Sequence, residues 1–530
     1  MNARLTLRRQ VNLAGPSGAV HRCAKRVCQR MLCSRQQLQV VFVASEVAPW
    51  SKTGGLADVM SALPAALVAR GHRVMTVSPR YSNYHNAVDT GLEAPHVLVD
   101  HPLFHADPDQ LVDPGATPSG AYLDPPGGLG LGAQARFNVL CQAALAAPLH
   151  VARSLARARI AFVLHNVAHS GLFSAASFPG LGLPTARLQQ LLTCVPASGS
   201  IDPKQAGSGQ ISWLQAGVLA SDLVLTVSPH HARELQQLAV AAENGVVGIM
   251  NGVDTGIWCP AGDPLLPRAL HYGPHTMKQG KAAAKALLQS RLGLAPNPHL
   301  PLFAFVGRLV EQKGADLLLA ALPLLLGPAA PGTLVMVGAG LESQEACLAQ
   351  LQTGWAGAAV GLPGFNPPLV HLLLAAADFL VLPSRWEPCG LLALQALRYA
   401  ALPLVSPVGG LMDAVGAGPA CGQEQDWGQW QQQQDLAPDQ QLVAHACGFS
   451  LPSAPGPSSS PSSTRHAVHS LAACMQRLAG LHGLPALDAM RVRCMQRELS
   501  WGPAATDWED SLAALVGATG CCPKVAAQSE

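Results

Sequence analysis

Leu302-Phe-Ala-Phe-Val306 runs directly into Gly307-Arg-Leu-Val-Glu-Gln-Lys-Gly314, and these two adjoining segments determine the class of fold. Five consecutive apolar residues are typical of a strand that is buried in a parallel sheet. The loop after them places two cations, Arg308 and Lys313, at the carboxyl end of that strand. Arginine offers a fork of donors and lysine a point charge, so together they suit a diphosphate. The alternative interpretation is a solvated basic turn.

Similar strand patterns alternate with helical patterns on both sides of this stretch. Such alternation predicts parallel sheets, with ligands at the carboxyl ends of the strands. Two sets of strands indicate an α/β protein with two doubly wound domains and a cleft between them. The expected strands are 39–45, 73–78, 160–164 and 223–227 in the first set and 302–306, 334–337 and 379–382 in the second, with helices over 57–69 and 211–219.

Two motifs of the first set carry candidate binding groups. Lys52-Thr-Gly-Gly-Leu56 lies between an expected strand and an expected helix. Glycines such as Gly54 and Gly55 let backbone N–H groups approach an anion, and a helix N-terminus favours negative charge. The other interpretation is a tight turn with a solvated lysine. His165-Asn166 ends another expected strand, although a lone histidine is more often structural.

A third motif, Pro383-Ser-Arg-Trp-Glu387-Pro-Cys-Gly-Leu391, also follows an expected strand. Proline favours the first turn of a helix, so we expect a helix that opens with Pro388 in that turn. Glu387 would then face the cleft as an acceptor for hydroxyl groups. Alternatively, its carboxylate would only complement the helix dipole.

Composition excludes several classes of protein. The net charge of +2, from 34 basic and 32 acidic residues, argues against a duplex nucleic-acid binder, which needs a basic face. The sequence has no apolar run long enough to predict a membrane span. The 14 cysteines lack a regular frame and indicate reduced thiols. We expect no metal site, because no His/Cys cluster has zinc spacing and Asp107-Pro-Asp109 lies in a Pro-rich loop.

Both ends of the chain differ from the rest. Residues 1–37 hold seven arginines, and the first acidic residue is Glu46. An arginine-rich leader without acidic residues or a long apolar run is typical of an organelle transit peptide, although a disordered basic tail is the alternative. Gln-rich and Pro/Ser-rich stretches within 420–464 indicate flexible insertions, and 518–530 indicates a tail.

These motifs, in their order along residues 40–516, resemble the family of bacterial-type glycogen synthases and plant starch synthases. The segment 178–184 most resembles soluble starch synthase class I. The motifs shared with the family include Lys52-Thr-Gly-Gly-Leu56, His165-Asn166, Val227-Ser-Pro229, Asn251-Gly-Val-Asp254, Gly307-Arg-Leu309, Gln312-Lys-Gly314, Ser384-Arg-Trp-Glu-Pro-Cys-Gly390, Gly409-Gly-Leu411 and Trp508-Glu509.

The resemblance implies a GT-B fold and retaining transfer of glucose from ADP-glucose to the non-reducing end of an α-1,4-glucan. ADP-glucose would be a substrate, no cofactor is implied, and the expected place is a plastid, in the stroma or on the starch granule. The implied domains are an acceptor-side domain (38–260), a nucleotide-sugar domain (261–490) and a terminal helix (491–517) that returns to the first domain.

The resemblance also implies roles for single residues. Lys52 and Gly55 would contact the donor, and Arg308 and Lys313 would hold its diphosphate. His165 would lie by the sugar. The glucose and distal phosphate would be held by Glu387 and by nearby groups of the backbone. The catalytic set is thus His165, Arg308, Lys313 and Glu387, and the donor-binding set is Lys52, Gly54, Gly55, Gly307, Cys389, Gly390, Leu391, Gly409 and Gly410.

The sequence departs from the family pattern at several points. Only 11 residues separate Pro148 from Ile160, and the family's Asp-Trp-His segment is missing there. Single positions also differ, such as Ala400 in place of a glycine. Two alternatives to an active enzyme follow: a catalytically impaired, glucan-associated scaffold paralogue, or a shortened gene product. A transferase for another nucleotide sugar is a further alternative, which the Lys52-Thr-Gly-Gly-Leu56 motif disfavours.

Overall fold

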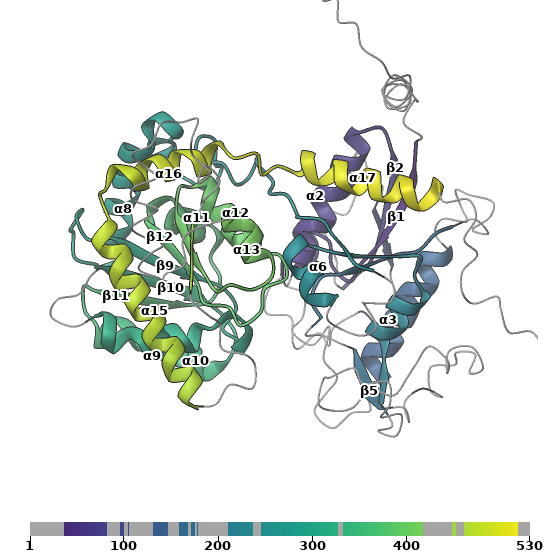
Figure 1. Ribbon diagram of the computed structural model, residues 1–530, viewed down its shortest axis with the longest axis horizontal. Coiled ribbons are helices and arrows are strands. Elements are labelled where there is room, and N and C mark those ends of the chain that lie inside the picture. Colours follow the sequence, from purple (N-terminus) through teal and green to yellow (C-terminus); the bar gives the residue numbers. More distant parts are fainter. Residues whose placement is uncertain are drawn as a thin grey trace, which may run out of the picture.

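A computed structural model describes residues 37–52, 54–81, 96–99, 104, 131–146, 158–167, 171–174, 178, 210–236, 245–326, 332–416, 448–451 and 461–517. Residues 1–36 of the expected leader, the Gln-rich insertion and the tail lie outside these residues. The chain forms two bodies that lie side by side (Figure 1), here called the N-terminal half and the C-terminal half. None of the described helices is long and apolar enough to cross a membrane.

The C-terminal half is built on one parallel sheet of six strands. Their order is β11-β10-β9-β12-β13-β14, so the direction of winding reverses between β9 and β12. Every residue of β9 is buried, as its apolar run predicts. The strands are β9 (Leu302–Val306), β10 (Thr333–Gly338), β11 (Ala359–Pro363), β12 (Phe379–Leu382), β13 (Leu402–Val405) and β14 (Phe449–Ser450).

Helices cover this sheet and complete its core. The expectation of a flexible linker up to residue 464 was wrong, because α15 begins at Pro461. The apolar residues of this helix pack on α9. The helices are α8 (Met277–Leu292), α9 (Ala315–Leu325), α10 (Glu342–Gly354), α11 (Pro367–Ala376), α12 (Leu391–Arg398), α13 (Gly410–Val415), α15 (Pro461–Leu481) and α16 (Pro485–Gln496), with short 3-10 turns at Arg268–Leu270, Pro274–Thr276 and Glu311–Lys313.

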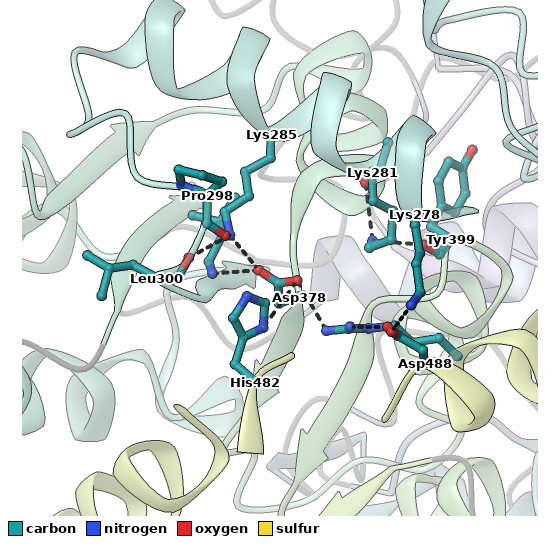
Figure 2. A network of polar contacts seen from close by, with 12 residues as sticks. Lys278, Lys281, Lys285, Pro298, Leu300, Asp378, Tyr399, His482 and Asp488 are labelled. Carbon is teal, nitrogen blue, oxygen red and sulfur yellow. Dashed lines mark hydrogen bonds and ion pairs between the residues drawn. The ribbon is translucent and has the colours of Figure 1, made fainter. Parts of the chain in front are cut away.

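A buried polar network ties these helices to the amino end of β12 (Figure 2). Asp378, the residue before β12, accepts hydrogen bonds from Lys285 at 2.9 Å and Arg491 at 3.1 Å. Burial opposes ionisation, but Arg491 and Lys285 keep the pKa of Asp378 low. Lys281 donates to three backbone carbonyls, including that of Tyr399 at 2.9 Å. The network therefore fixes the end of the sheet opposite to the loops after β9 and β12.

The described residues of the N-terminal half form two separate parallel sheets of three strands, β1-β2-β3 and β4-β7-β8, and a small antiparallel pair, β5-β6. The strand predictions near 39, 73, 160 and 223 are confirmed. The strands are β1 (Gln39–Val43), β2 (Arg73–Pro79), β3 (His96–Val99), β4 (Ala161–Leu164), β5 (Leu172–Ser174), β6 (Gln210–Ser212), β7 (Leu223–Thr226) and β8 (Val247–Gly248).

Five helices accompany these strands in the described part of the N-terminal half. The predicted helix over 57–69 is confirmed as α2, which ends before Gly71 in a left-handed conformation (φ 92°). The predicted helix over 211–219 begins two residues later, because 210–212 pair as β6. The helices are α2 (Gly55–Ala69), α3 (Leu131–Ala146), α5 (Trp213–Ala220), α6 (Pro229–Leu235) and α17 (Trp501–Gly517).

The last helix returns the chain to the N-terminal half. α16 still packs in the core of the C-terminal half, whereas α17 crosses to lie on α2 (Figure 1). The Trp508 ring lies 5.9 Å from that of Phe42 on β1, and Glu509 pairs with Arg70 at 2.5 Å. The core under α17 also includes Val163 of β4, so one apolar layer joins both three-stranded sheets.

Candidate active site

Two loops of the C-terminal half meet where the sheet reverses its winding. β9 and β12 are neighbours in register, with Phe303 opposite Phe379, so the loops that follow them leave the sheet side by side. Ligands of doubly wound sheets bind at such a switch point. Gly314 shows how closely these loops approach, because a Cβ on it would lie 2.0 Å from the Pro383 carbonyl oxygen. The topology thus brings the predicted cations and Glu387 together.

The closest polar contact at this point joins Lys313 and Glu387. The Lys313 Nζ atom lies 2.5 Å from Glu387 Oε2, and Ser384 Oγ donates to the same oxygen at 3.4 Å. Both charged side chains retain some exposure, 24% for Lys313 and 14% for Glu387. The ammonium group is therefore neutralised by an internal carboxylate and still reaches solvent, where an anionic ligand can approach it.

Arg308 lies on the exposed side of the same loop. Its Nη2 atom donates to Gln312 Oε1 at 3.2 Å, and Gln312 Nε2 donates to the Trp386 carbonyl at 3.1 Å. Gln312 thus connects the guanidinium group to the second loop. Gly307 precedes Arg308, and a Cβ on it would meet nothing closer than 3.6 Å.

Arg385 fixes the two loops from beneath. Its guanidinium group donates to both carboxylate oxygens of Asp316, at 2.8 and 2.6 Å, and to the Glu311 carbonyl at 2.7 Å. Such forked pairs constrain geometry as well as charge. Sequence reasoning did not assign a role to Arg385 or Gln312. Their only signal was a place inside the two motifs.

The segment around Cys389 differs from its prediction in one respect. The helix opens at Leu391 with Gly390 (φ 72°) as its N-cap, so Pro388 lies before the helix and not in its first turn. Glycine adopts this left-handed conformation without strain. Because Gly390 is not helical, the helix cannot extend back to Pro388. Burial, with the nearby Glu387 charge, raises the pKa of the Cys389 thiol to about 12. That thiol is therefore neutral at physiological pH.

The backbone N–H groups of Gly409 and Gly410 already have partners. Gly409 N–H donates to Glu234 Oε1 at 2.8 Å, and Gly410 N–H donates to the Glu387 carbonyl at 3.0 Å. Gly409 has φ 45°, and a Cβ on it would lie 2.2 Å from the Glu387 carbonyl oxygen. This turn therefore requires glycine, and it holds the Glu387 backbone in place.

The predicted lysine loop of the N-terminal half faces this segment. Lys52 pairs with Asp58 at 2.6 Å, and its side chain is 42% exposed. Gly54 N–H donates to Glu46 Oε2 at 3.3 Å. A Cβ on Gly55, the first residue of α2, would lie 3.7 Å from Leu391 Cδ2. The structure thus places Gly55 against the start of α12 in the other half.

His165 lies in the bend after β4 and is half-buried. Burial lowers its pKa to about 4, so the imidazole is neutral near pH 7. It makes no hydrogen bond with Arg308, Lys313 or Glu387. A neutral imidazole at a strand end can donate from one nitrogen and accept at the other.

Among the described residues, no group of three or more His, Cys, Asp or Glu side chains is arranged to hold a metal ion. Asp107-Pro-Asp109 lies outside them.

Family comparisons cover most of the chain. The starch synthase catalytic domain matches residues 39–152 and 137–251, and glycosyl transferases group 1 match residues 291–433. The first match is split into two pieces, and the split falls near the stretch where the sequence lacks the Asp-Trp-His segment.

Plant starch synthases are among the relatives. Granule-bound starch synthase 1 of Solanum tuberosum is 33% identical over 572 residues, covering 94% of this chain and 86% of the relative. The corresponding protein of Arabidopsis thaliana is 31% identical, with 94% and 85% covered. The alignment of 572 positions is longer than the 530-residue chain, so the potato relative has segments that this chain lacks. The likeness of 178–184 to soluble class I stays a prediction.

Solved structures show the same fold. The catalytic domain of starch synthase IV from Arabidopsis thaliana has a TM-score of 0.65 at 24% identity and covers 91% of this chain and 100% of that one. Sucrose-phosphate synthase from Thermosynechococcus elongatus has a TM-score of 0.53 at 17% identity, with 92% and 100% covered. The predicted GT-B fold is confirmed. The family match and the plant relatives do not favour a non-catalytic scaffold. The chain belongs to the starch synthase family of glycosyltransferases, and its function is glucosyl transfer in starch synthesis.

Proposed function

We propose that the chain transfers glucose from ADP-glucose to the non-reducing end of an α-1,4-glucan, with retention at the anomeric carbon. The observation that carries this proposal is the meeting of Arg308, Lys313 and Glu387 at the switch point between β9 and β12. Two cations and a carboxylate in one place suit a ligand that carries both a diphosphate and sugar hydroxyl groups.

Arg308 and Lys313 would act on the leaving group. As the bond between the glucose C1 atom and the phosphate oxygen breaks, negative charge grows on the diphosphate. Cations placed there stabilise the transition state more than the ground state. Lys313 would exchange its contact with Glu387 for one with the distal phosphate. The acceptor hydroxyl oxygen bonds to C1 on the face that the phosphate leaves, its proton passes to an oxygen of the departing diphosphate, and ADP is released.

Glu387 and His165 would position the sugar. Once the donor phosphate draws Lys313 away, the Glu387 carboxylate accepts hydrogen bonds from glucose hydroxyl groups. The neutral His165 imidazole can donate to one hydroxyl group and accept from another. Lys52 would turn from Asp58 toward the donor. Backbone groups of Gly54, Gly55, Gly307, Gly390 and Gly409–Gly410 and the side chains of Cys389 and Leu391 would line the rest of the donor site.

Labelled glucose incorporation tests this proposal directly. The full chain is incubated with glycogen and either ADP-glucose or UDP-glucose, labelled in the glucose, and the insoluble product is counted. We expect incorporation from ADP-glucose that exceeds incorporation from UDP-glucose at least tenfold and is lost in Arg308→Ala. Equal use of both donors would reject the ADP preference. Incorporation from neither donor would reject the proposed activity.

We also propose that the protein works in a plastid. The names of the relatives from Solanum tuberosum and Arabidopsis thaliana describe them as chloroplastic/amyloplastic, and the arginine-rich leader suits import. N-terminal sequencing of the protein from isolated plastids should give a start between about Arg26 and Leu38. Recovery of an intact Met1 or Asn2 from plastids would contradict leader cleavage.

A further inference from the structure

Two short helices, one from each half, meet at the junction of the bodies. α6 of the N-terminal half and α13 of the C-terminal half lie side by side there (Figure 1). Glu234 on α6 accepts the Gly409 N–H at the start of α13, at 2.8 Å. Asp413 on α13 accepts the His230 N–H in the first turn of α6, at 2.7 Å. Each helix thus supplies a carboxylate that caps the other.

Electrostatics favour both carboxylates as caps of a helix N-terminus. A helix start carries unpaired N–H groups and a positive partial charge, so a carboxylate there is stabilised. Although burial works in the other direction, hydrogen bonds from His231 and Gly409 lower the pKa of Glu234. Glu234 is therefore ionised near pH 7. Hydrogen bonds to a charged acceptor are about twice as strong as neutral ones.

This contact continues into the candidate active site. Gly409 donates to Glu234, and the next residue, Gly410, donates to the Glu387 carbonyl at 3.0 Å. A second route is shorter, because Ser228 Oγ at the N-cap of α6 donates to the Pro388 carbonyl at 2.7 Å. The carbonyl groups of Glu387 and Pro388 are therefore both held by hydrogen bonds whose geometry depends on where α6 lies.

We propose that Glu234 and Asp413 form a closure latch, which holds the N-terminal half against the Glu387 loop in the arrangement that supports turnover. Both are positioning residues, since they act through the Gly409 turn and α6 and need not touch substrate. Reciprocal capping makes the latch specific, because both hydrogen bonds form only when α6 and α13 are in register. The kinetic part of this inference rests on the proposed function.

Paired alanine variants measure the latch in kinetics and in binding. We expect Glu234→Ala and Asp413→Ala each to lower kcat for glucan elongation roughly tenfold, or about 1.4 kcal/mol. The dissociation constant of ADP, measured by calorimetry, should change less than twofold, because the proposed diphosphate cations lie in the C-terminal half. Glu234→Gln keeps an acceptor oxygen and should recover part of the rate.

Glu345→Ala is a matched control. The Glu345 carboxylate also accepts a backbone N–H, that of Gly340 at 2.7 Å, but within the C-terminal half. Its kcat should equal that of the unchanged chain. Unchanged kcat in both latch variants would overturn the proposal. Loss of ADP affinity equal to the loss of kcat would also overturn it, because Glu234 would then serve the donor site directly.

Solution scattering keeps the test independent of activity. The Glu234→Ala/Asp413→Ala double variant should have a larger radius of gyration than the unchanged chain, since the halves would separate. An equal radius would overturn the latch. If the unchanged chain incorporates no glucose while the double variant still expands, the latch stands and the proposed activity fails.

Discussion

The two halves of the molecule differ in how their sheets are completed. In the C-terminal half, six parallel strands form one sheet, and its central strand β9 is buried throughout. In the N-terminal half, the described strands form two separate sheets of three, and Val41 and Val43 on β1 are 38% and 45% exposed. Parallel sheets are normally covered on both faces. Among the described residues, the C-terminal half therefore has one continuous sheet and is called the finished half, whereas the strands of the N-terminal half fall into two sheets and it is called the interrupted half.

The interruption has a defined place. β1 and β4 contribute to one core under α2 and α17, yet no pairing between them is found among the described strands. The family's Asp-Trp-His segment would precede β4 in the sequence, and residues 147–157 lie outside the described residues. We expect a strand and helix supplied by that segment to lie between the two sheets. The groups expected to bind the donor therefore lie mostly in the finished half.

Loss of the buried network around Asp378 should have the largest effect, because this network stabilises the finished half. Asp378→Ala would leave Lys285 and Arg491 buried without their shared carboxylate. Removing one partner of a buried ion pair costs about 3–5 kcal/mol. The midpoint of denaturant unfolding of the C-terminal half should therefore fall to a clearly lower denaturant concentration. Lys278→Ala is the control, because this ammonium group is 68% exposed and forms a surface ion pair with Asp488. Equal shifts in the two variants would show that the Asp378 network does not stabilise the half.

The next largest effects concern the cations that are proposed to bind ADP-glucose, two in the C-terminal half and one in the N-terminal half. Lys313→Ala and Arg308→Ala should each lower turnover about a hundredfold, since losing one donor to a developing anion costs on the order of 3 kcal/mol. Lys52→Ala should cost less, no more than about tenfold, because exposed charges are screened. Initial rates of glucose incorporation measure all three variants. Equal losses at Lys52 and Lys313 would remove the distinction between the halves.

A repair of the interrupted half should act in the opposite direction. Inserting a family-type Asp-Trp-His strand and helix between Pro148 and Ile160 should supply a partner for β1 and β4, which do not pair with each other among the described strands. Each buried backbone group that gains a partner avoids a cost of about 1–3 kcal/mol. We expect a higher melting temperature of the N-terminal half and faster elongation. An insertion of equal length and scrambled sequence is the control. Equal behaviour of the two insertions would contradict the assigned place of the gap.

The smallest effect tests a departure inside the finished half. Ala400 has φ 55°, where the family pattern has glycine, and left-handed backbone costs about 1–2 kcal/mol for other residues. Relief of this strain in Ala400→Gly should offset the lost methyl group, leaving the free energy of unfolding unchanged within about 0.5 kcal/mol. Ala401→Gly has no strain to relieve and should lose about 1 kcal/mol. Equal losses at both positions would contradict the strain argument.

Sequence alone could predict the parts of the fold that follow from local pattern. The apolar runs before Gly307 and Pro383 gave β9 and β12, and parallel strands made the approach of Lys313 to Glu387 expected. The start of α15 at Pro461 was missed because a Pro/Ser-rich stretch hides a helix that tertiary packing stabilises. The proline preference for a first helical turn also failed at Pro388, where the glycine turn at Gly390 starts the helix instead.

Contacts between the halves could not be predicted. Glu234 and Asp413 are far apart in sequence, and nothing in the pattern around either residue signals a backbone partner across a junction. Gln312 and Arg385 were visible only as members of motifs. Such residues are found once the topology places their loops side by side, because their role depends on distance and not on residue type.

We expect donor recognition to reside in the finished half and the interrupted half to limit elongation. Calorimetric titration of ADP into the full chain, with the elongation rate of the same preparation, tests it most directly. We predict measurable ADP binding that is lost in Arg308→Ala, together with elongation that is slow and that rises after the Asp-Trp-His segment is inserted. Absence of ADP binding, or full elongation that the insertion does not increase, would contradict this expectation.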